Sequence, residues 1–280
     1  MAVSIDNYLQ RLSKKYYLKN NSEEVKRIDN SIKRLLKKLN DEFGKSIKKP
    51  FIFGSYDRDT ILPRVFDPQS DVDLMVIFKQ KNPATTPEMY RQLLRDFAYK
   101  HYKIRYGTKV VNSSPTVTIR LKNINYDLVP AKEEKLSNRR SLSIPGKDGW
   151  QTTDPNDVKH KLRGANTRYG QIVRPIVRLL KAWNCAAGYP YDSYLLELKI
   201  ANISFFNHSV ESGLFYAIDQ LYPTWGDTQT KKKKIERLKY NIDKVKAALN
   251  EDKSERAKHW LHKVFPKPPQ NKKSHPGFPK

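Results

Sequence analysis

The sequence predicts an α+β protein with two lobes and a cleft between them. Short apolar strands separated by helices run to about residue 130, and beyond residue 157 the pattern is helical. A block of strands followed by a block of helices is typical of α+β folds. Hydrophobic residues make up 38% of the 280 residues, enough for a buried core. We expect a sheet-bearing lobe over 1–150, a helical lobe over 151–265 and an extended basic tail over 266–280, with the N-terminal helix packing as a spine across both lobes.

The elements of the first lobe follow from residue patterning. Between Asn21 and Gly44 apolar residues recur at helical spacing. Asn21 is expected to cap this helix, Glu24 stands at the capping-box position, and Gly44 supplies the stop. Thr116 to Leu121 alternates apolar and polar residues, as a half-buried strand does. The other expected elements are strands at 51–53, 72–78 and 124–129, and a helix over 87–102.

The second lobe is expected to begin after a long polar loop. Strands stop near Pro130 in this prediction, and the loop runs from Lys132 to Asp157. Beyond it, apolar spacing predicts helices over 171–187, 193–206, 232–249 and 254–264. The tail from Pro266 is rich in Pro and Lys and is predicted to be extended.

The charge balance narrows the classes of partner. Lys and Arg outnumber Asp and Glu by 54 to 29, a net charge of +25. This excess favours nucleotides, RNA, DNA or an anionic membrane surface, without choosing among them. The single cysteine, Cys185, excludes an intramolecular disulfide and a cysteine-based zinc site. Because no apolar run reaches membrane-spanning length and no signal-peptide core is present, we expect a cytoplasmic protein without membrane contact.

Three carboxylates stand in an order that suits two-metal chemistry. Asp71 and Asp73 open an apolar strand, and Asp127 lies on a later one. Strand residues two apart point the same way, about 6.5 Å apart, so Asp71 and Asp73 can share metal ions. Two hard cations about 3.5–4 Å apart can hold the attacking hydroxyl and the departing pyrophosphate of an in-line displacement. The alternative is an Asx-rich loop with Asp73 as its cap, which would leave a costly buried charge.

A small turn, Gly54-Ser55-Tyr56, precedes the paired carboxylates. Gly54 allows close backbone approach to a phosphate, and Ser55 can hydrogen-bond it. Together with Asp71, Asp73 and Asp127, this turn resembles the DNA polymerase beta nucleotidyltransferase superfamily. Four segments narrow the resemblance to the branch of cyclic GMP-AMP synthase and oligoadenylate synthase: 126–131, 174–183, 193–197 and 257–266. The likeness implies a nucleotidyltransferase core, a mixed β-sheet with flanking helices, and a helical spine lobe, with the active site between them.

The short chain, without a fused second enzyme, is similar to the bacterial CD-NTases, the cyclic-oligonucleotide synthases of antiphage (CBASS) signalling, and most of all to the compact E-clade (CdnE-like) enzymes. The resemblance implies that Asp71, Asp73 and Asp127 are catalytic and bind two Mg²⁺ or Mn²⁺ ions, which carboxylates suit better than zinc. Asp127 is also expected to lie nearest the acceptor 3′-hydroxyl; alternatively it is a satisfied strand-end carboxylate. Asp59 departs from the family, which often has a smaller residue there, and adds negative charge near the phosphates.

Further nucleotide contacts follow from the same resemblance, each with a structural alternative. Gly54 and Ser55 are expected to hold the triphosphate. Lys181 is either a phosphate-binding ammonium or a solvated lysine beside Trp183. Ser193 either contacts the nucleotide or is the N-cap of its helix. Asn166 either reads a base edge, which would suit uracil, or caps a helix. Glu197 is expected to be an internal partner of a basic side chain.

The predicted function is synthesis of a cyclic dinucleotide from ATP and UTP, or other nucleoside triphosphates, with a uracil-containing product such as cyclic UMP-AMP. The product would act on a separate effector protein, and the enzyme is expected to be a monomer. One alternative is a toxin-like nucleotidyltransferase acting on RNA or a tRNA 3′ end. Another is a non-catalytic protein whose basic surface binds nucleic acid; Lys231 to Lys234 would belong to that surface or to a solvated helix face.

Overall fold

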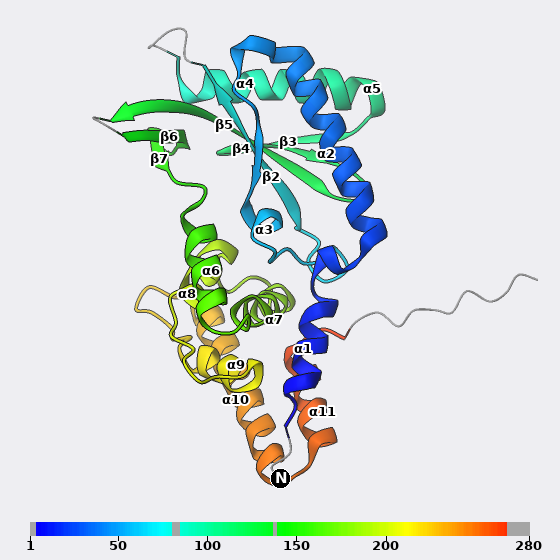
Figure 1. Ribbon diagram of the computed structural model, residues 1–280, viewed down its shortest axis with the longest axis vertical. Helices are drawn as coiled ribbons and strands as arrows, with labels where there is room; N and C mark the ends of the chain where they lie inside the picture. The colour runs from blue at the N-terminus through cyan, green and yellow to red at the C-terminus, as the bar shows by residue number, and fades with distance from the viewer. Residues whose placement is uncertain (1–3, 80–84, 137–138, 268–280) are drawn as a thin grey trace, which may run out of the picture.

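Two lobes are stacked along the long axis of the molecule, a sheet lobe above a helical lobe (Figure 1). The computed structural model describes residues 4–79, 85–136 and 139–267. The chain begins in the helical lobe with α1 (Asp6–Lys15), whose Leu9 and Leu12 belong to that lobe's core. It then crosses to the sheet lobe, where Leu18 already belongs to the other core. The N-terminal segment therefore links the two lobes.

The sheet lobe is built on one seven-stranded sheet. Its main order is β1 (Phe51–Phe53), β2 (Asp71–Phe78), β5 (Asn125–Leu136), β4 (Thr116–Arg120) and β3 (Lys109–Ser113). The central neighbours β2 and β5 run parallel, and the other pairs are antiparallel. Strand β6 (Arg139–Gly146) pairs with the far end of β5 and with β7 (Gly149–Thr153).

Helices cover one face of this sheet. Helix α2 (Ser22–Phe43) and helix α4 (Pro87–Ala98) share a core with alternate residues of β2, namely Val72, Leu74 and Val76. The Asn21 side chain accepts from the backbone of Glu24 and Gly44 ends α2, so both predicted caps are confirmed. A π-helical turn (Tyr99–Lys103) and α5 (Ile104–Tyr106) extend α4. The short helix α3 (Gly54–Asp57) follows β1 directly.

The predicted polar loop from Lys132 to Asp157 is wrong. Strand β5 continues past Pro130, and β6 and β7 form a hairpin on its end. Polar side chains contact one another on this ribbon: Ser143 Oγ of β6 donates to Glu134 of β5 at 2.6 Å, and Lys132 Nζ lies 2.6 Å from Glu134 on the same strand. Strand β6 has a short alternating pattern, in which Leu142 and Ile144 pack against the cluster of Met75, Ile77, Val129 and Ala131. The end of β5 beyond Ala131 and β7 are mostly polar and lack the apolar alternation by which a strand is predicted from sequence.

The helical lobe contains α6 (Asp157–Arg168), α7 (Val173–Ala186), α8 (Ser193–Ala201), α9 (Val210–Asp219), α10 (Gln229–Asn250) and α11 (Ser254–Val264). Helix α7 is its centre, since nearly all its apolar residues are buried and α1, α8 and α9 pack round it. The predicted helices are confirmed in position, although the one beginning at Ser193 ends at Ala201 rather than at Phe206. The described part of the chain contains no helix long and apolar enough to cross a bilayer.

Candidate active site

Three aspartates converge on the sheet face that the helices leave uncovered. Asp71 and Asp73 alternate with the buried residues of β2 and therefore point away from α2 and α4. Strand β5 lies parallel to β2 in a register that sets Asp127 directly opposite Asp73. Thr118 of β4 is opposite Asp127 on the other side, and its Oγ1 donates to Asp127 Oδ1 at 2.6 Å. The sheet register thus brings the three predicted carboxylates together.

These carboxylates are costly to ionise together. Burial, reinforced by the charges of Asp73 and Asp127, raises the pKa of Asp71 to about 8. Burial and the Asp127 charge raise the pKa of Asp73 to about 7, against the opposing effect of Arg58. Burial also raises the pKa of Asp127, although the hydrogen bond from Thr118 partly offsets it. A cation placed among them would favour the charged form of all three.

The donor set fits a hard divalent cation. It consists of carboxylate oxygens, which Mg²⁺ and Mn²⁺ prefer, and its raised pKa values reflect crowded negative charge. Within the described ranges no three His, Cys, Asp or Glu residues form a preassembled metal cage. Mg²⁺ is usually held by one or two carboxylates plus substrate phosphates, so the nucleotide would complete the coordination.

Gly54 borders the same aspartates from the turn after β1. Its backbone adopts φ of +74°, in the left-handed region that glycine tolerates best. A β-carbon at this position would clash with the Asp73 carboxylate. Ser55 follows in α3 and lines the cavity next to the carboxylates. Glycine at position 54 therefore serves both the turn and the close approach of Asp73.

A cavity of about 470 Å³ opens over Asp71 and Asp73, between the two lobes. Five of the predicted site residues line it: Ser55, Asp71, Asp73, Lys181 and Ser193. The remaining wall comes from Arg58 after α3, from the loop before β2 (Asp67, Gln69 and Ser70), from the turn between α7 and α8 (Tyr189, Tyr191 and Asp192) and from α8 (Tyr194 and Glu197). The volume is within the range typical of small-molecule sites.

Lys181 is buried at the floor of this cavity and is not the solvated lysine of the alternative prediction. Its Nζ donates to Glu197 Oε1 at 2.8 Å. The other oxygen of Glu197 accepts from Arg58 Nε at 2.8 Å and from Thr60 Oγ1 at 2.9 Å. Glu197 is thus confirmed as an internal partner of basic side chains. Since Arg58 and Thr60 belong to the sheet lobe, this buried cluster also joins the lobes beneath the cavity.

Ser193 is the first residue of α8 rather than its N-cap. The cap is Asp192, whose side chain accepts from the Leu195 backbone at 2.9 Å. Because the capping role belongs to Asp192, the structural alternative for Ser193 is wrong. The Ser193 side chain lies at the cavity wall.

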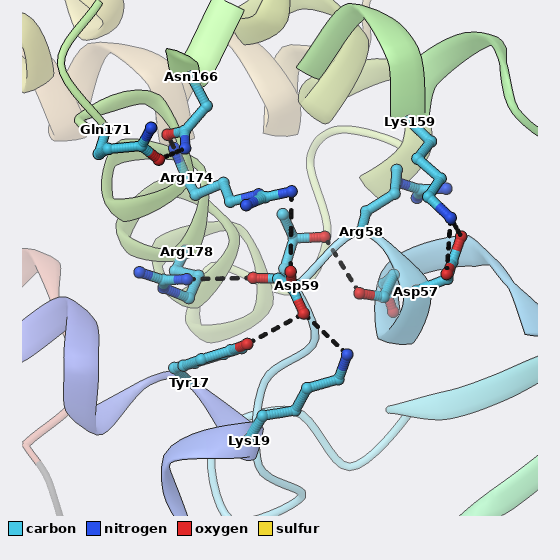
Figure 2. A network of polar contacts seen from close by, with 12 residues as sticks. Tyr17, Lys19, Asp57, Arg58, Asp59, Lys159, Asn166, Gln171, Arg174 and Arg178 are labelled. Carbon is cyan, nitrogen blue, oxygen red and sulfur yellow. Dashed lines mark hydrogen bonds and ion pairs between the residues drawn. The ribbon is translucent and has the colours of Figure 1, made fainter. Parts of the chain in front are cut away.

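Asn166 stands apart from the cavity. Its Oδ1 accepts from the Arg174 backbone at 2.9 Å, and its Nδ2 donates to Gln171 Oε1 (Figure 2). Only 3% of the residue is exposed. These contacts hold the turn between α6 and α7, which supports the helix-capping interpretation and not the base-reading one.

Comparison with known proteins places the chain in a family. A model of the Second Messenger Oligonucleotide or Dinucleotide Synthetase (SMODS) domain matches residues 3–166, more than half of the chain. The chain belongs to the SMODS family. The resemblance to bacterial cyclic-oligonucleotide synthases is therefore confirmed at the level of the family.

Relatives of this SMODS protein include a CBASS oligonucleotide cyclase, CdnC, from Escherichia coli strain KTE188, which is 24% identical over 182 residues. The match covers 63% of this chain and 57% of the relative, so the chain spans just over half the length of the curated relatives it matches. The structure of E. coli MS115-1 CdnC with ATP aligns with a TM-score of 0.68 at 17% identity, covering 94% of this chain and 98% of that one. The Rhodothermus marinus CdnE c-UMP-AMP synthase aligns with a TM-score of 0.51 at 14% identity, covering 75% and 90%. Membership of the E clade stays a prediction.

Asp59, where the SMODS chain was expected to add negative charge near the phosphates, does not line the cavity. Its carboxylate accepts from Tyr17 at 3.0 Å and from Lys19 at 2.7 Å, and it lies 3.7 Å from Arg174 (Figure 2). Arg178 Nη1 donates to the Asp59 backbone carbonyl at 3.1 Å. The Asp59 carboxylate is therefore neutralised by cationic side chains of the segment after α1 and of α7. These contacts also hold the loop after α3 against that segment and against α7.

Sequence reasoning missed two residues that act on the predicted set, Thr118 and Arg58. Thr118 appeared only as a polar position in an alternating strand, and its contact with Asp127 depends on strand pairing. Arg58 follows the Gly54 turn directly, yet its partner Glu197 is 139 residues away. The only sequence feature that could have indicated a role for Arg58 is its position just after the Gly54-Ser55-Tyr56 turn.

Proposed function

We propose that this SMODS protein is a cyclic-oligonucleotide synthase, which joins two nucleoside triphosphates by nucleotidyl transfer to a ribose hydroxyl and then closes the ring, with pyrophosphate leaving at each step. The observation that carries the proposal is the β2–β5 register, which sets Asp127 opposite Asp73, a lining residue of the interlobe cavity. The crowded, desolvated carboxylates are suited to holding cations beside a triphosphate.

The chain's residues take distinct roles in this reaction. Asp71, Asp73 and Asp127 would hold Mg²⁺ or Mn²⁺, which would supply charge stabilisation for the reacting phosphate. The Gly54 backbone and Ser55 bind triphosphate oxygens from the turn beside Asp73. Lys181 adds positive charge to the floor, while Glu197 fixes its orientation. Thr118 positions the Asp127 carboxylate and favours its charged form. Catalysis would rest mainly on positioning and electrostatics.

The partners follow from the relatives. CdnC is named a CBASS oligonucleotide cyclase, so we infer that the product of this chain serves a CBASS effector. A uracil-containing product such as cyclic UMP-AMP stays a prediction. Asn166 does not support the uracil prediction, because its amide is hydrogen-bonded within the α6–α7 turn.

The test is incubation of the purified chain with radiolabelled nucleoside triphosphates, singly and in pairs, with Mg²⁺ or Mn²⁺. Nuclease- and phosphatase-resistant products are then identified by mass. We expect a cyclic product in the absence of RNA, and none from the variant with Asp71→Asn and Asp73→Asn. Products containing only purines would contradict the uracil prediction while leaving the cyclase proposal intact.

The same experiment separates the alternative functions. Label transferred to added tRNA, without any cyclic product, would instead show an RNA nucleotidyltransferase. If the native chain makes no product, and nucleic-acid binding persists in the variant with Asp71→Asn and Asp73→Asn, the chain is a non-catalytic binding protein.

A further inference from the structure

A second cavity, of about 340 Å³, lies within the helical lobe. It is enclosed by the C-terminal end of α7, the middle of α10 and the end of α11. Its lining residues are Trp183, Ala186, Ala187, Lys234, Arg237, Leu238, Asn241, Lys263 and Val264. None of them lines the catalytic cavity. Trp183 and Lys181 are two residues apart on α7, about 200° round the helix, so the two cavities lie on opposite sides of it.

The charge of this cavity is one-sided. Lys234, Arg237 and Lys263 line it, and the lining includes no Asp or Glu. Over the described ranges, none of these three cations forms an ion pair with a carboxylate. Other lysines of α10 are paired: Lys231 lies 2.7 Å from Asp227, and Lys246 lies 3.2 Å from Asp219. Arg237 and Lys263 are exposed, and Lys263 Nζ lies 3.8 Å from the centre of the Trp260 ring. Three cations that line one cavity without a counter-ion create a local preference for an anion.

Two buried polar side chains in the same wall lack partners. Asn241 is only 6% exposed and Trp183 only 5%. Within the part of the chain that the structure describes, neither the Asn241 carboxamide nor the Trp183 indole N–H makes a hydrogen bond. Buried polar groups are nearly always hydrogen-bonded, by protein, water or ligand. Both residues line the cavity, and neither contributes a fully buried polar atom without a partner, so their polar atoms are open to water or to a ligand in the cavity.

We propose that this cavity is a binding site for a nucleoside monophosphate or a phosphate ester of similar size and shape. The phosphate would lie among Lys234, Arg237 and Lys263, where a guanidinium and ammonium groups suit phosphate oxygens. The Asn241 carboxamide offers both a donor and an acceptor for the edge of a planar ring. Leu238 and Val264 supply apolar surface for the ring itself. The site is independent of the proposed catalytic function.

The test measures binding of AMP, GMP, CMP and UMP to the full chain by calorimetry and thermal shift, with EDTA present so that the metal-dependent site does not contribute. We expect saturable binding of at least one of them. Removal of a charge-assisted hydrogen bond weakens binding about tenfold or more, so Lys234→Ala and Arg237→Ala should each do so. Lys233→Ala is the matched control, since Lys233 is exposed on the same helix and does not line the cavity.

Two further variants separate a ligand site from a structural role. Asn241→Leu removes an amide to which no protein group in the described part of the chain is hydrogen-bonded, so the ligand-free melting temperature should stay near that of the native chain while the ligand-induced shift disappears. The variant with Asp71→Asn and Asp73→Asn should bind the monophosphate as the native chain does. The proposal is overturned if no monophosphate binds, if Lys234→Ala with Arg237→Ala binds normally, or if inorganic phosphate binds as tightly as the nucleotides.

Discussion

The carboxylate of Asp73 packs directly against the α-carbon of Gly54, leaving no room for a β-carbon. The contact joins the turn expected to hold phosphate to the strand that carries two of the three aspartates. A substitution at position 54 therefore acts on the site in two ways, by straining the backbone and by displacing a carboxylate.

Gly54→Ala is expected to abolish nucleotidyl transfer while leaving the fold intact. An Ala at φ of +74° costs about 1–2 kcal/mol of stability, and its methyl group would push Asp73 out of position. The matched control is Gly107→Ala, at φ of +65° with nothing within 4 Å of the added methyl. Both variants should lose the stability that backbone strain costs in urea titrations, and Gly54→Ala should lose more because Asp73 must shift; only Gly54→Ala should lose activity. Equal activity of the Gly54→Ala and Gly107→Ala variants would show that the contact between Gly54 and Asp73 is not needed for catalysis.

Thr118→Val should weaken catalysis without disturbing the strand. Valine has nearly the same shape as threonine but cannot donate the 2.6 Å hydrogen bond to Asp127. We expect the pKa of Asp127 to rise further and the Mg²⁺ concentration needed for half-maximal rate to increase by about 10–100-fold. Thr118→Ser keeps the hydroxyl and should retain near-native behaviour. A Thr118→Val enzyme with unchanged Mg²⁺ dependence would rule out this positioning role.

Glu197 should govern stability in acid. Burial alone would raise its pKa, but Lys181 and Arg58 outweigh that effect and lower the pKa to about 2. Its unfolded-state pKa is about 4.3, so its contribution is fully present above that pH and is lost as the pH falls towards 2. Glu197→Gln should cost about 3–5 kcal/mol at pH 7, because two buried cations lose their partner.

The measurement is urea unfolding of both proteins between pH 7 and pH 2. The Glu197→Gln stability curve should be the flatter one below pH 4.5, and the two curves should converge as the acid limit is approached. Parallel curves would contradict the assignment of acid sensitivity to this cluster.

Metal binding should release protons. Because burial and neighbouring charge raise the pKa of Asp71 to about 8, the metal-free site holds a proton at neutral pH that a cation must displace. Calorimetric titration of Mg²⁺ with a non-hydrolysable triphosphate, in buffers of different ionisation enthalpy, should reveal that release at pH 7. Asp71→Asn should release fewer protons. Identical heats in all buffers would mean that the site is already ionised.

Local patterns predicted much of the fold. The α2 helix, with its Asn21 cap and its Gly44 stop, is encoded within its own residues, as are β2 and α11. In the β6–β7 hairpin only β6 carries a local signal, the alternation of Leu142 and Ile144 with serines, while β7 and the end of β5 are mostly polar. The pairing of β6 with β5, including the contact of Ser143 with Glu134, became visible only in the structure. For Asn166 and Ser193, the sequence left two interpretations open. The contacts that distinguish the two interpretations are the hydrogen bond from the Arg174 backbone to Asn166 and the capping of α8 by Asp192, and both are seen only in the structure.

The sequence by itself determined that Asp71 and Asp73 share one face of a strand, because side chains alternate with a fixed period of two. Only the tertiary structure decided that Asp127 lies opposite Asp73, that Thr118 holds it, and that Glu197 joins Lys181 to Arg58. Strand order and interlobe packing depend on contacts between residues far apart in the sequence, and they are determined by which apolar surfaces are buried against each other. Residues near in space and far apart in the chain carry no local pattern that reveals their pairing.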